Sequence, residues 1–381
     1  MNVDLPAAAY LAALAGLPGM GPRRLGALLR EQSAQDAWSG IATGRLATQP
    51  EWAGTAPAWA VAARSLDLGA HWSAHLEAGV GIVTPEDPSS PSVLAVDPEP
   101  PSVLFHRGAL SVLERPRVAI VGTRRCTSTG KSVAHELGRE LAGAGVCVLS
   151  GLALGIDGAS HAGALEVATA APVAVVATGL DIVYPRQHGD LWASVAAAGA
   201  VLSEYPLGTG PQRWRFPARN RIIAALADVV VVVESHAAGG SMHTVDAAIE
   251  RSRTVMAVPG SVRNPASVGT NALLAAGCPP VRDAGDVLVA LGLVGEAADR
   301  RPDPTPVPPD GTAGIVLDSI GWQPATIDEV VSRSGLDAGA VAVELVRLEL
   351  DGWLVNHSGW LERRQRDATA STMPAPTCRP P

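Results

Sequence analysis

The sequence predicts an α/β protein with an open, doubly wound parallel sheet at its centre, a helical domain before it and a winged-helix-like domain after it. Short β-branched runs alternate with amphipathic stretches between about Arg117 and Leu293. Residues 5 to about 80 have the apolar spacing of helices, and a Pro-rich linker precedes three further helical segments. With 381 residues, of which 47% are hydrophobic, the chain can bury a large core.

We assign residues 1–80 to a helical domain of the helix-hairpin-helix or SAM-like type. Its stretch "LPGMGPRRLGALL" places a Pro/Gly turn between two apolar helices. In a helix-hairpin-helix, such a Gly-x-Gly turn offers backbone N–H groups to a phosphate. The alternative is a tight turn inside a small helical bundle, because glycines end helices of every kind. Both interpretations stay open.

The central segment, residues 81–295, is expected to contain the sheet. Its apolar runs are short and are closed by Gly, Ser or Pro, which is typical of parallel strands buried on both faces. Six runs fit: "RVAIVG" (117–122), "GVCVLSG" (145–151), "PVAVVATG" (172–179), "GAVLSEY" (199–205), "DVVVVVES" (228–235) and "TVMAVPG" (254–260). Helical stretches fill the gaps, so we expect a ligand at the carboxyl ends of the strands.

After the core, residues 296–311 form a Pro- and charge-rich linker. Residues 312–364 contain three helical segments and then "NHSGWLERR", which predicts a winged helix. The third helical segment carries four acids against one cation: Asp337, Glu344, Glu349 and Asp351 against Arg347. Phosphates would repel it, so we expect this domain to contact protein or to pack rather than to read a DNA groove. Residues 365–381 are expected to be a disordered tail.

Composition excludes several classes of protein. The net charge of -8 excludes a protein that coats nucleic acid or anionic membrane by bulk attraction, so polyanion binding would need a focused cationic patch. The four cysteines are widely spaced and lack histidines at metal-ligand spacing, which indicates a reducing compartment. No apolar run approaches the ~20 residues of a membrane span, and Asp4 stands where a signal peptide would be basic. We expect a cytoplasmic protein with no membrane association, metal or cofactor.

The loop after the first parallel strand, "GTRRCTSTGKS", has the composition of a phosphate site. Gly122 permits a tight turn, and Arg124 and Arg125 supply bidentate donors. The Thr/Ser run that follows caps a helix whose positive end favours phosphate. The alternative is an ordinary turn with a solvated arginine pair. The loop also resembles the end of a P-loop, but Arg125 stands where that motif requires glycine, so an ATPase is a minor hypothesis.

Loops after other strands also have the composition of a phosphate site. The loop after the second strand begins with Ser150 and Gly151, and Asp157 stands where a helix N-cap is wanted. Asp157 and His161 could be acid–base machinery, but we favour a capping Asp and a polar His on one helix face. The fifth strand leads into a second glycine turn at a helix start. Two such helix starts on adjoining strands predict a broad anion-binding floor.

Residues 213–221, "RWRFPARNR", bring four arginines and two aromatic rings into nine positions of an acidic chain. An extended segment would place the rings of Trp214 and Phe216 on one face and two guanidinium groups on the other. Rings beside a cationic track are the device that proteins use to stack single-stranded nucleic acid.

The helix that follows would have Arg219 and Arg221 in or near its first turn, where cations oppose the helix dipole unless an anion compensates. The alternative is that Phe216 lies in the core and that the arginines pair with Glu204 and Asp228. We expect Phe216 to pack and both helix arginines to face the ligand.

The strand-end motifs, in this order, resemble those of the DNA-processing protein A family (DprA, also called Smf). The matching segments cover essentially all of residues 100–290: "IVGTRRCTSTG", "SGLALGIDGASHAGAL", "TGLDIVYPRQHGDL", "SEYPLGTGPQRWRFPARNRIIAAL", "VVVVESHAAGGSMHT" and "AVPGSVRNPASVGTNALLAAGC". The resemblance implies an extended Rossmann-like core in a non-catalytic binder of single-stranded DNA. Such a protein would protect incoming strands during natural transformation, help to load a RecA-type recombinase and act as a homodimer.

By matching motif, the resemblance implies a DNA-phosphate pocket made of strand-end residues. They are Gly122, Thr123, Arg124, Ser150, Gly151, Arg219, Asn220, Arg221, Gly240, Ser241 and Thr244, and we add Arg125 from its place in the first loop. Met242 and His243 depart from the family pattern, because the glycine turn usually continues with apolar residues. Lys131 is the only lysine, so arginine supplies nearly all of the cationic groups.

The sheet also resembles that of nucleotide sensors and nucleoside-monophosphate phosphoribohydrolases. Those hydrolases have a G-G-x-G-T turn followed directly by glutamate. Here the turn reads "GGSMHTVD", with Met242 at the third glycine position and Val245 where the acid is expected. We therefore place a nucleotide-cleaving enzyme second and a P-loop ATPase third, and we expect no catalytic residue.

Overall fold

The computed structural model describes residues 5–293, 309–321, 323–357 and 359–363. It divides into two compact units, Met1–Leu293 and Val294–Pro381. Most of the predicted linker and all of the predicted tail lie outside the described residues. None of the helices that the structure describes has the length and the apolar run that crossing a bilayer requires.

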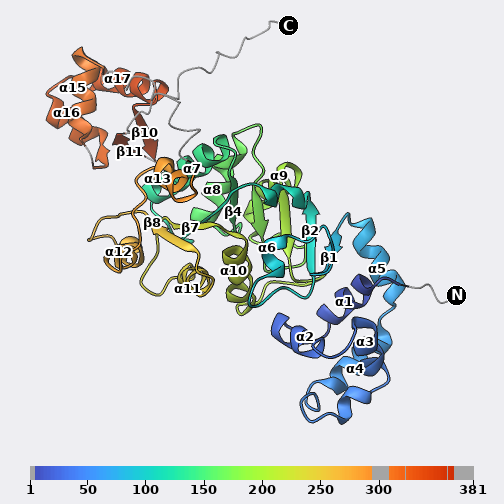
Figure 1. Cartoon of the computed structure of the whole chain (residues 1–381). Coiled ribbons are helices and arrows are strands. Elements are labelled where there is room, and N and C mark those ends of the chain that lie inside the picture. The colour runs from blue at the N-terminus through green and yellow to red at the C-terminus, as the bar shows by residue number, and fades with distance from the viewer. Residues whose placement is uncertain (1–4, 294–308, 322, 358, 364–381) are drawn as a thin grey trace, which may run out of the picture. The chain divides into compact units, whose positions relative to one another are not determined.

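An eight-stranded sheet forms the centre of the first unit (Figure 1). Its strands are β1 (Gly81–Val83), β2 (Leu104–Gly108), β3 (Arg117–Val121), β4 (Cys147–Ser150), β5 (Val173–Val175), β6 (Ala200–Ser203), β7 (Val229–Val232) and β8 (Thr254–Ala257). Their order in space is β1-β2-β6-β5-β4-β3-β7-β8. The strands from β3 to β8 are parallel, which confirms the six predicted runs. The antiparallel pair β1-β2 at the edge was not predicted, because β1 is short and β2, "LFHRG", is half polar.

Successive strand residues alternate between two layers of helices. Val118 and Ile120 of β3 share a buried cluster with α7 (Ser128–Gly143), α8 (Ile156–Leu165) and α13 (Ala284–Ala290). Ala119 and Val121 share another with α10 (Arg215–Leu226), α11 (Met242–Glu250) and α12 (Val268–Ala275). Helices therefore cover both faces of the sheet, and the predicted doubly wound α/β class is confirmed.

The chain changes direction across the sheet at β3. From β3 it adds β4, β5 and β6 on one side, and it then returns to place β7 and β8 on the other side. The loop after β3 leads to α7 on one face, and the loop after β7 leads to α11 on the opposite face. Doubly wound sheets bind ligands in the crevice that forms between two such loops.

From residue 5 onward, five α-helices and one 3-10 helix (Arg45–Thr48) precede the sheet; the α-helices are α1 (Ala7–Ala15), α2 (Pro22–Leu28), α3 (Ala34–Ala42), α4 (Ala56–Ser65) and α5 (Leu68–Glu77). Their buried residues Leu14 and Trp59 belong to the same cluster as Phe105 of β2 and Val195 of α9 (Gly189–Ala198). The helical character predicted for residues 5 to about 80 is confirmed. The structure joins these helices and the sheet in one compact unit instead of separating a domain at residue 80.

The described residues of the second unit form three helices and a three-stranded sheet. They are α15 (Gly311–Ile320), α16 (Ile327–Ser334) and α17 (Ala338–Leu350), with β9 (Ala325–Thr326), β10 (Leu354–His357) and β11 (Trp360–Arg363) in the order β10-β11-β9. A capping box between Thr326 and Glu329 fixes the start of α16. The winged-helix prediction is confirmed, although the two-residue strand β9 was not predicted.

Candidate functional site

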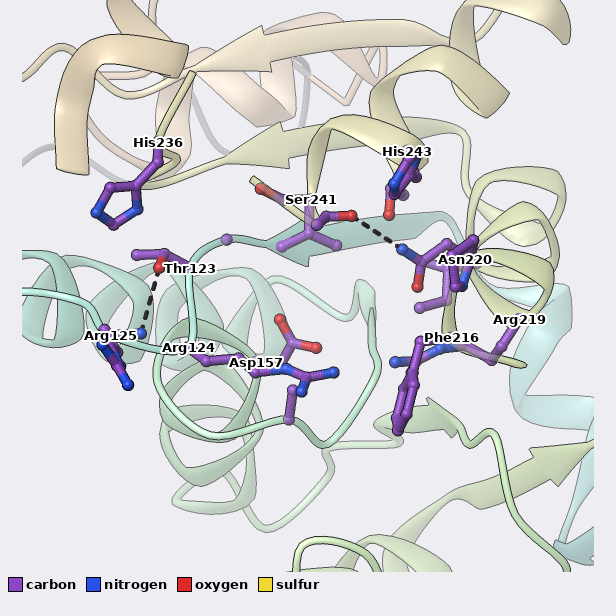
Figure 2. Close-up of a pocket in the computed structure, with 17 residues that line it drawn as sticks. Thr123, Arg124, Arg125, Asp157, Phe216, Arg219, Asn220, His236, Ser241 and His243 are labelled. Atoms are coloured by element: carbon purple, nitrogen blue, oxygen red, sulfur yellow. Dashed lines mark hydrogen bonds between the residues drawn. The ribbon is translucent and has the colours of Figure 1, made fainter. Parts of the chain in front are cut away.

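A pocket of about 460 Å³ lies where β3 and β7 end, at the predicted crevice (Figure 2). Its main walls are the loop after β3, the first turns of α10 and the glycine turn that leads into α11. Nine predicted site residues line it: Gly122, Thr123, Arg124, Arg125, Arg219, Asn220, Gly240, Ser241 and Thr244. We call it the strand-end pocket.

The loop after β3 is held by hydrogen bonds and exposes its two arginines. The N–H of Thr123 donates to the carbonyl of Glu234 (2.8 Å), and the N–H of Arg125 donates to the Thr123 hydroxyl (3.2 Å; Figure 2). The Arg124 guanidinium lies 4.8 Å from the centre of the Phe216 ring. A phosphate and a neighbouring base could use such a pair of cations beside an aromatic ring.

The start of α7 is occupied by a carboxylate, contrary to the expectation that it would hold a phosphate. Glu234 accepts hydrogen bonds from the backbone N–H of Thr127 (2.8 Å) and from its hydroxyl (2.6 Å). A Cβ on Gly130 would lie 2.3 Å from the carboxyl carbon of Glu234, so the carboxylate lies directly against this helix end. An internal anion therefore satisfies the positive end of the helix.

Helix α10 begins at Arg215, so the extended segment predicted before Pro217 is wrong. Proline fits the first turn of a helix because the N–H of that turn has no intrahelical partner, and Pro217 therefore does not mark the boundary. The predicted separation of rings and guanidinium groups onto two faces does not occur. Phe216 is half-buried, lies 5.6 Å from the ring of Tyr184 and lines the pocket.

Arg219 lines the pocket but is only 5% exposed. Its guanidinium donates to the carbonyl of Val175 and lies near Asp157, whose carboxylate accepts from the N–H of Gly151 (3.1 Å). Burial lowers the pKa of Arg219 to about 10 and raises the pKa of Asp157, and their opposite charges counteract both shifts. The predicted N-cap role of Asp157 is wrong, because Gly155 holds that position of α8. Arg219 thus forms a fixed floor of the pocket.

The glycine turn before α11 supplies another wall. The side-chain amide of Asn220 donates to the carbonyl of Gly240 (3.2 Å), and the Ser241 hydroxyl donates to that of Ser235 (2.9 Å). Ser241 is the N-cap residue of α11, and its side chain makes no capping hydrogen bond. Of the two helix starts predicted to bind anions, this one lies in the pocket wall, where backbone N–H groups and the helix dipole favour a phosphate.

Arg221 does not line the strand-end pocket. It forms an ion pair with Glu204 (2.5 Å) in which the Glu204 side chain is 4% exposed. Burial raises the pKa of Glu204 to about 7, against the lowering effect of Arg221. The alternative in which this arginine pairs with Glu204 is therefore confirmed, whereas Asp228 pairs with Arg117 (2.6 Å).

Two further predicted site residues lie behind the wall of the strand-end pocket. Ser150 is fully buried, and its hydroxyl donates to the carbonyl of Ile120 (2.7 Å). Gly151 passes so close to Arg219 that a Cβ would lie 1.9 Å from a guanidinium nitrogen. Both residues therefore support the floor of the pocket instead of lining it.

Sequence reasoning missed two pocket residues and left the role of a third open. His236 was not considered, Asp157 was interpreted as a cap, and the role of His243 was undecided; all three line the pocket. The position of His236 shortly after β7 was an available signal, since it places the residue at the same sheet edge. Val245, where a phosphoribohydrolase would have its acid, is buried in α11. Asp157 is the only carboxylate among the lining residues, and the described part of the chain has no cluster of metal-ligating side chains.

Two family models match the chain. The model for DNA recombination-mediator protein A matches residues 81–292, and that for the DprA winged helix domain matches residues 300–359. Protein Smf from Synechocystis is 33% identical over 326 residues, which are 76% of this chain and 82% of that protein.

Two solved structures are similar to this chain at comparable sequence identity. DNA processing protein A from Streptococcus pneumoniae gives a TM-score of 0.60 at 29% identity and covers 75% of this chain and 98% of its own. DNA processing protein A from Helicobacter pylori, whose structure concerns its single-stranded DNA binding mode, gives a TM-score of 0.50 at 30% identity. That match covers 56% of this chain and 95% of the other.

Proposed function

The chain belongs to the DNA recombination-mediator protein A family, and on this premise we propose that it binds single-stranded DNA without sequence preference. The observation that carries the proposal is the strand-end pocket. Two exposed arginines, an aromatic ring and an open helix start converge there in a chain of net charge -8. A local cationic site in an acidic protein indicates a specific anionic ligand and not bulk attraction.

The geometry supports contacts to the backbone of a strand. Arg124 and Arg125 would bind phosphates, as would the N–H groups at the start of α11, and Phe216 would stack on a base. Phosphate contacts carry no sequence information, and stacking accepts every base. We therefore expect affinity to depend on strand length and salt instead of sequence.

We propose that the protein acts by binding and not by catalysis. Asp157, the one carboxylate in the wall of the pocket, is buried beside Arg219 and accepts a hydrogen bond from Gly151. It is therefore a poor candidate for the acid that would cleave a nucleotide. Release of free base from a nucleoside monophosphate, or of phosphate from ATP, would contradict this part of the proposal.

We further propose the cellular role that the family resemblance implies. The protein would act in the cytoplasm as a homodimer, protect incoming single strands during natural transformation and help to load a RecA-type recombinase. Strand-exchange assays test the last step, because a mediator should shorten the lag of the recombinase on strands coated with a single-strand binding protein.

Titration of fluorescent oligo-dT and of a matched duplex across a salt series tests the binding proposal. We expect single strands to bind far better than duplex, and log K to fall with log salt by about 0.7 per neutralised phosphate. The double variant Arg124→Ala/Arg125→Ala should weaken binding and flatten the slope. Arg282→Ala is a matched control, because Arg282 is exposed and pairs with Asp286 outside the pocket. Equal binding of duplex and single strand, or an unchanged slope in the double variant, would contradict the proposal.

A further inference from the structure

A second pocket, of about 530 Å³, adjoins the strand-end pocket. It lies between the Gly-x-Gly turn before α2 and the faces of α10 and α11, and its volume is within the range of nucleotide-sized sites. Pro217 and His243 line both pockets, so the two share a wall. We call the second one the Trp214 pocket after the aromatic residue in its lining.

Trp214 is held in place yet remains 45% exposed. Its indole N–H donates to the side-chain carbonyl of Gln212 (2.7 Å), and its ring meets Tyr205 edge-on with centroids 6.2 Å apart. The Arg215 guanidinium lies 5.2 Å from the centre of the Trp214 ring. A Cβ on Gly21 would lie 3.3 Å from two ring carbons, so the glycine turn reaches the indole edge. An exposed ring held from several sides is a preorganised stacking surface.

The arginines that line the Trp214 pocket differ in whether a buried carboxylate neutralises them. Arg251 is buried in an ion pair with Asp97 (2.6 Å), and Arg221 is paired with Glu204. Arg24 is exposed, and its guanidinium donates to the carbonyl of Gly19 (2.6 Å). The three carboxylates in the lining are Glu99, Asp246 and Glu250.

Arg23 is a highly exposed cation in the lining. Its side chain is 92% exposed, and its ion pair with Glu99 is open to water (3.3 Å). A solvent-exposed ion pair of this kind contributes little, so a phosphate can replace its carboxylate. Asp246 and Glu250 both lie on α11, so a phosphate would bind on the side of Arg23 and Arg24.

We propose that the Trp214 pocket binds the next part of the same single strand, with a base stacked on Trp214 and a phosphate at Arg23 and Arg24. The proposal rests on the proposed function, because the strand-end pocket must hold the strand first. It gives the glycine turn before α2 a role in DNA binding through its approach to the indole, and gives the first turn of α2 such a role through Arg23 and Arg24.

Titration of an oligo-dT length series with the full-length protein tests this proposal. Trp214→Ala should weaken binding of long oligomers by about 5- to 150-fold, the range for loss of one stacked base. It should leave the shortest oligomers unaffected, because the strand-end pocket alone holds them. Trp214→Phe should restore most of the loss, and Arg24→Ala should lower the salt slope by about 0.7 for long oligomers only. Trp360→Ala removes an exposed tryptophan of the other unit and is the matched control.

The controls separate failure of this inference from failure of the proposed function. If the wild type does not bind oligo-dT, or Arg124→Ala binds as well as the wild type, both proposals fall. If Arg124→Ala loses binding while Trp214→Ala and Arg24→Ala match the wild type at every length, only this inference falls. If the Trp214→Ala protein does not fold, the inference is tested by the Arg24→Ala variant and by photocrosslinking of a 5-iododeoxyuridine oligomer to the wild type. A crosslink in the peptide that contains Trp214 supports the inference, and its absence from that peptide overturns it.

Discussion

Arg219 holds the floor of the strand-end pocket through its charge. It is buried near Asp157, and burial raises the pKa of that carboxyl while Arg219 lowers it. Removal of Arg219 leaves the Val175 carbonyl without its hydrogen bond and the buried Asp157 carboxylate without a compensating charge nearby, which costs about 1–3 kcal/mol. We expect Arg219→Ala to lower the free energy of unfolding by an amount of this order, measured by urea denaturation.

The double variant Arg219→Ala/Asp157→Asn is the control for that effect. Because the second change removes the unpaired carboxylate, the double variant should recover part of the lost stability. If the two substitutions are additive, Asp157 and Arg219 are not coupled and this account is wrong.

His161 predicts a loss of stability in acid. It is fully buried in α8, where the backbone of Ser150 favours its protonated form but burial opposes that form more strongly. Burial, with the like charges of His188 and Arg219, lowers its pKa from 6.5 to about 3. In the unfolded chain the His161 ring is therefore protonated below about pH 6.5, whereas in the folded chain it stays neutral down to about pH 3. We expect the free energy of unfolding to fall between these values by several kcal/mol.

A His161→Leu variant isolates this contribution from that of the carboxylates. Its unfolding free energy, measured in urea from pH 7 to pH 4, should fall less steeply than that of the wild type. Parallel curves for the two proteins would show that His161 titrates normally in the folded state.

At the scale of elements, Glu234 links two parts of the fold. It follows β7, and its carboxylate accepts two hydrogen bonds from Thr127 at the start of α7. Hydrogen bonds to charged groups contribute about 1.5–3 kcal/mol each, and the N-cap residue Thr127 keeps its own hydrogen bond from the N–H of Gly130. Glu234→Ala removes two bonds to the carboxylate, so we expect it to lower the free energy of unfolding by about 3–6 kcal/mol, measured by urea denaturation.

The same substitution tests which helix start takes the phosphate. Glu234 does not line the strand-end pocket. The Glu234→Ala protein should therefore keep its affinity for oligo-dT within a few-fold while it loses stability. A loss of binding comparable to that of Arg124→Ala, in a protein that is still folded, would assign the start of α7 to the ligand.

The strands could be predicted from sequence because a parallel strand buried on both faces is apolar at every position. "DVVVVVES" and "RVAIVG" are such runs, and they become the central strands β7 and β3. The start of α10 could not be predicted, since proline is compatible with both a helix start and an extended segment. Strand β2, which lies next to the edge strand β1, was hidden because its residues His106 and Arg107 are polar.

The position of the candidate site could be predicted from the sequence, but the roles of its individual residues could not. The rule that ligands bind where strands end placed nine residues in one pocket. Sequence gives residue types but not burial, so Arg219 and Arg221 were interpreted as ligands like Arg124. Only the fold shows that Arg219 is enclosed and that Arg221 is paired with Glu204.

At the scale of the whole molecule, net charge and site charge have opposite signs. The chain carries -8, so any strand approaches against a weak repulsion until it meets the exposed arginines of the first unit. In the second unit, α17 and the residues at its ends carry Asp337, Glu344, Glu349 and Asp351 against Arg347. Salt should therefore screen both the repulsion between the strand and the acidic chain and the attraction between its phosphates and the arginines. The Arg124 and Arg125 variants are needed to separate these two effects.

Each unit has its own buried core, and the strand-end and Trp214 pockets lie entirely in the first. A protein that ends at Leu293 should therefore fold and bind oligo-dT with an affinity within about threefold of the full chain. Fluorescence anisotropy measures the affinity and far-ultraviolet circular dichroism the fold, with Arg124→Ala in the truncated protein as the control for specific binding. A folded, truncated protein that binds tenfold more weakly would show that the winged-helix unit contacts DNA despite its acidic helix. Unchanged binding would indicate that the winged-helix unit contacts protein instead of DNA, through exposed apolar residues of α17 such as Val343, Val346 and Leu350.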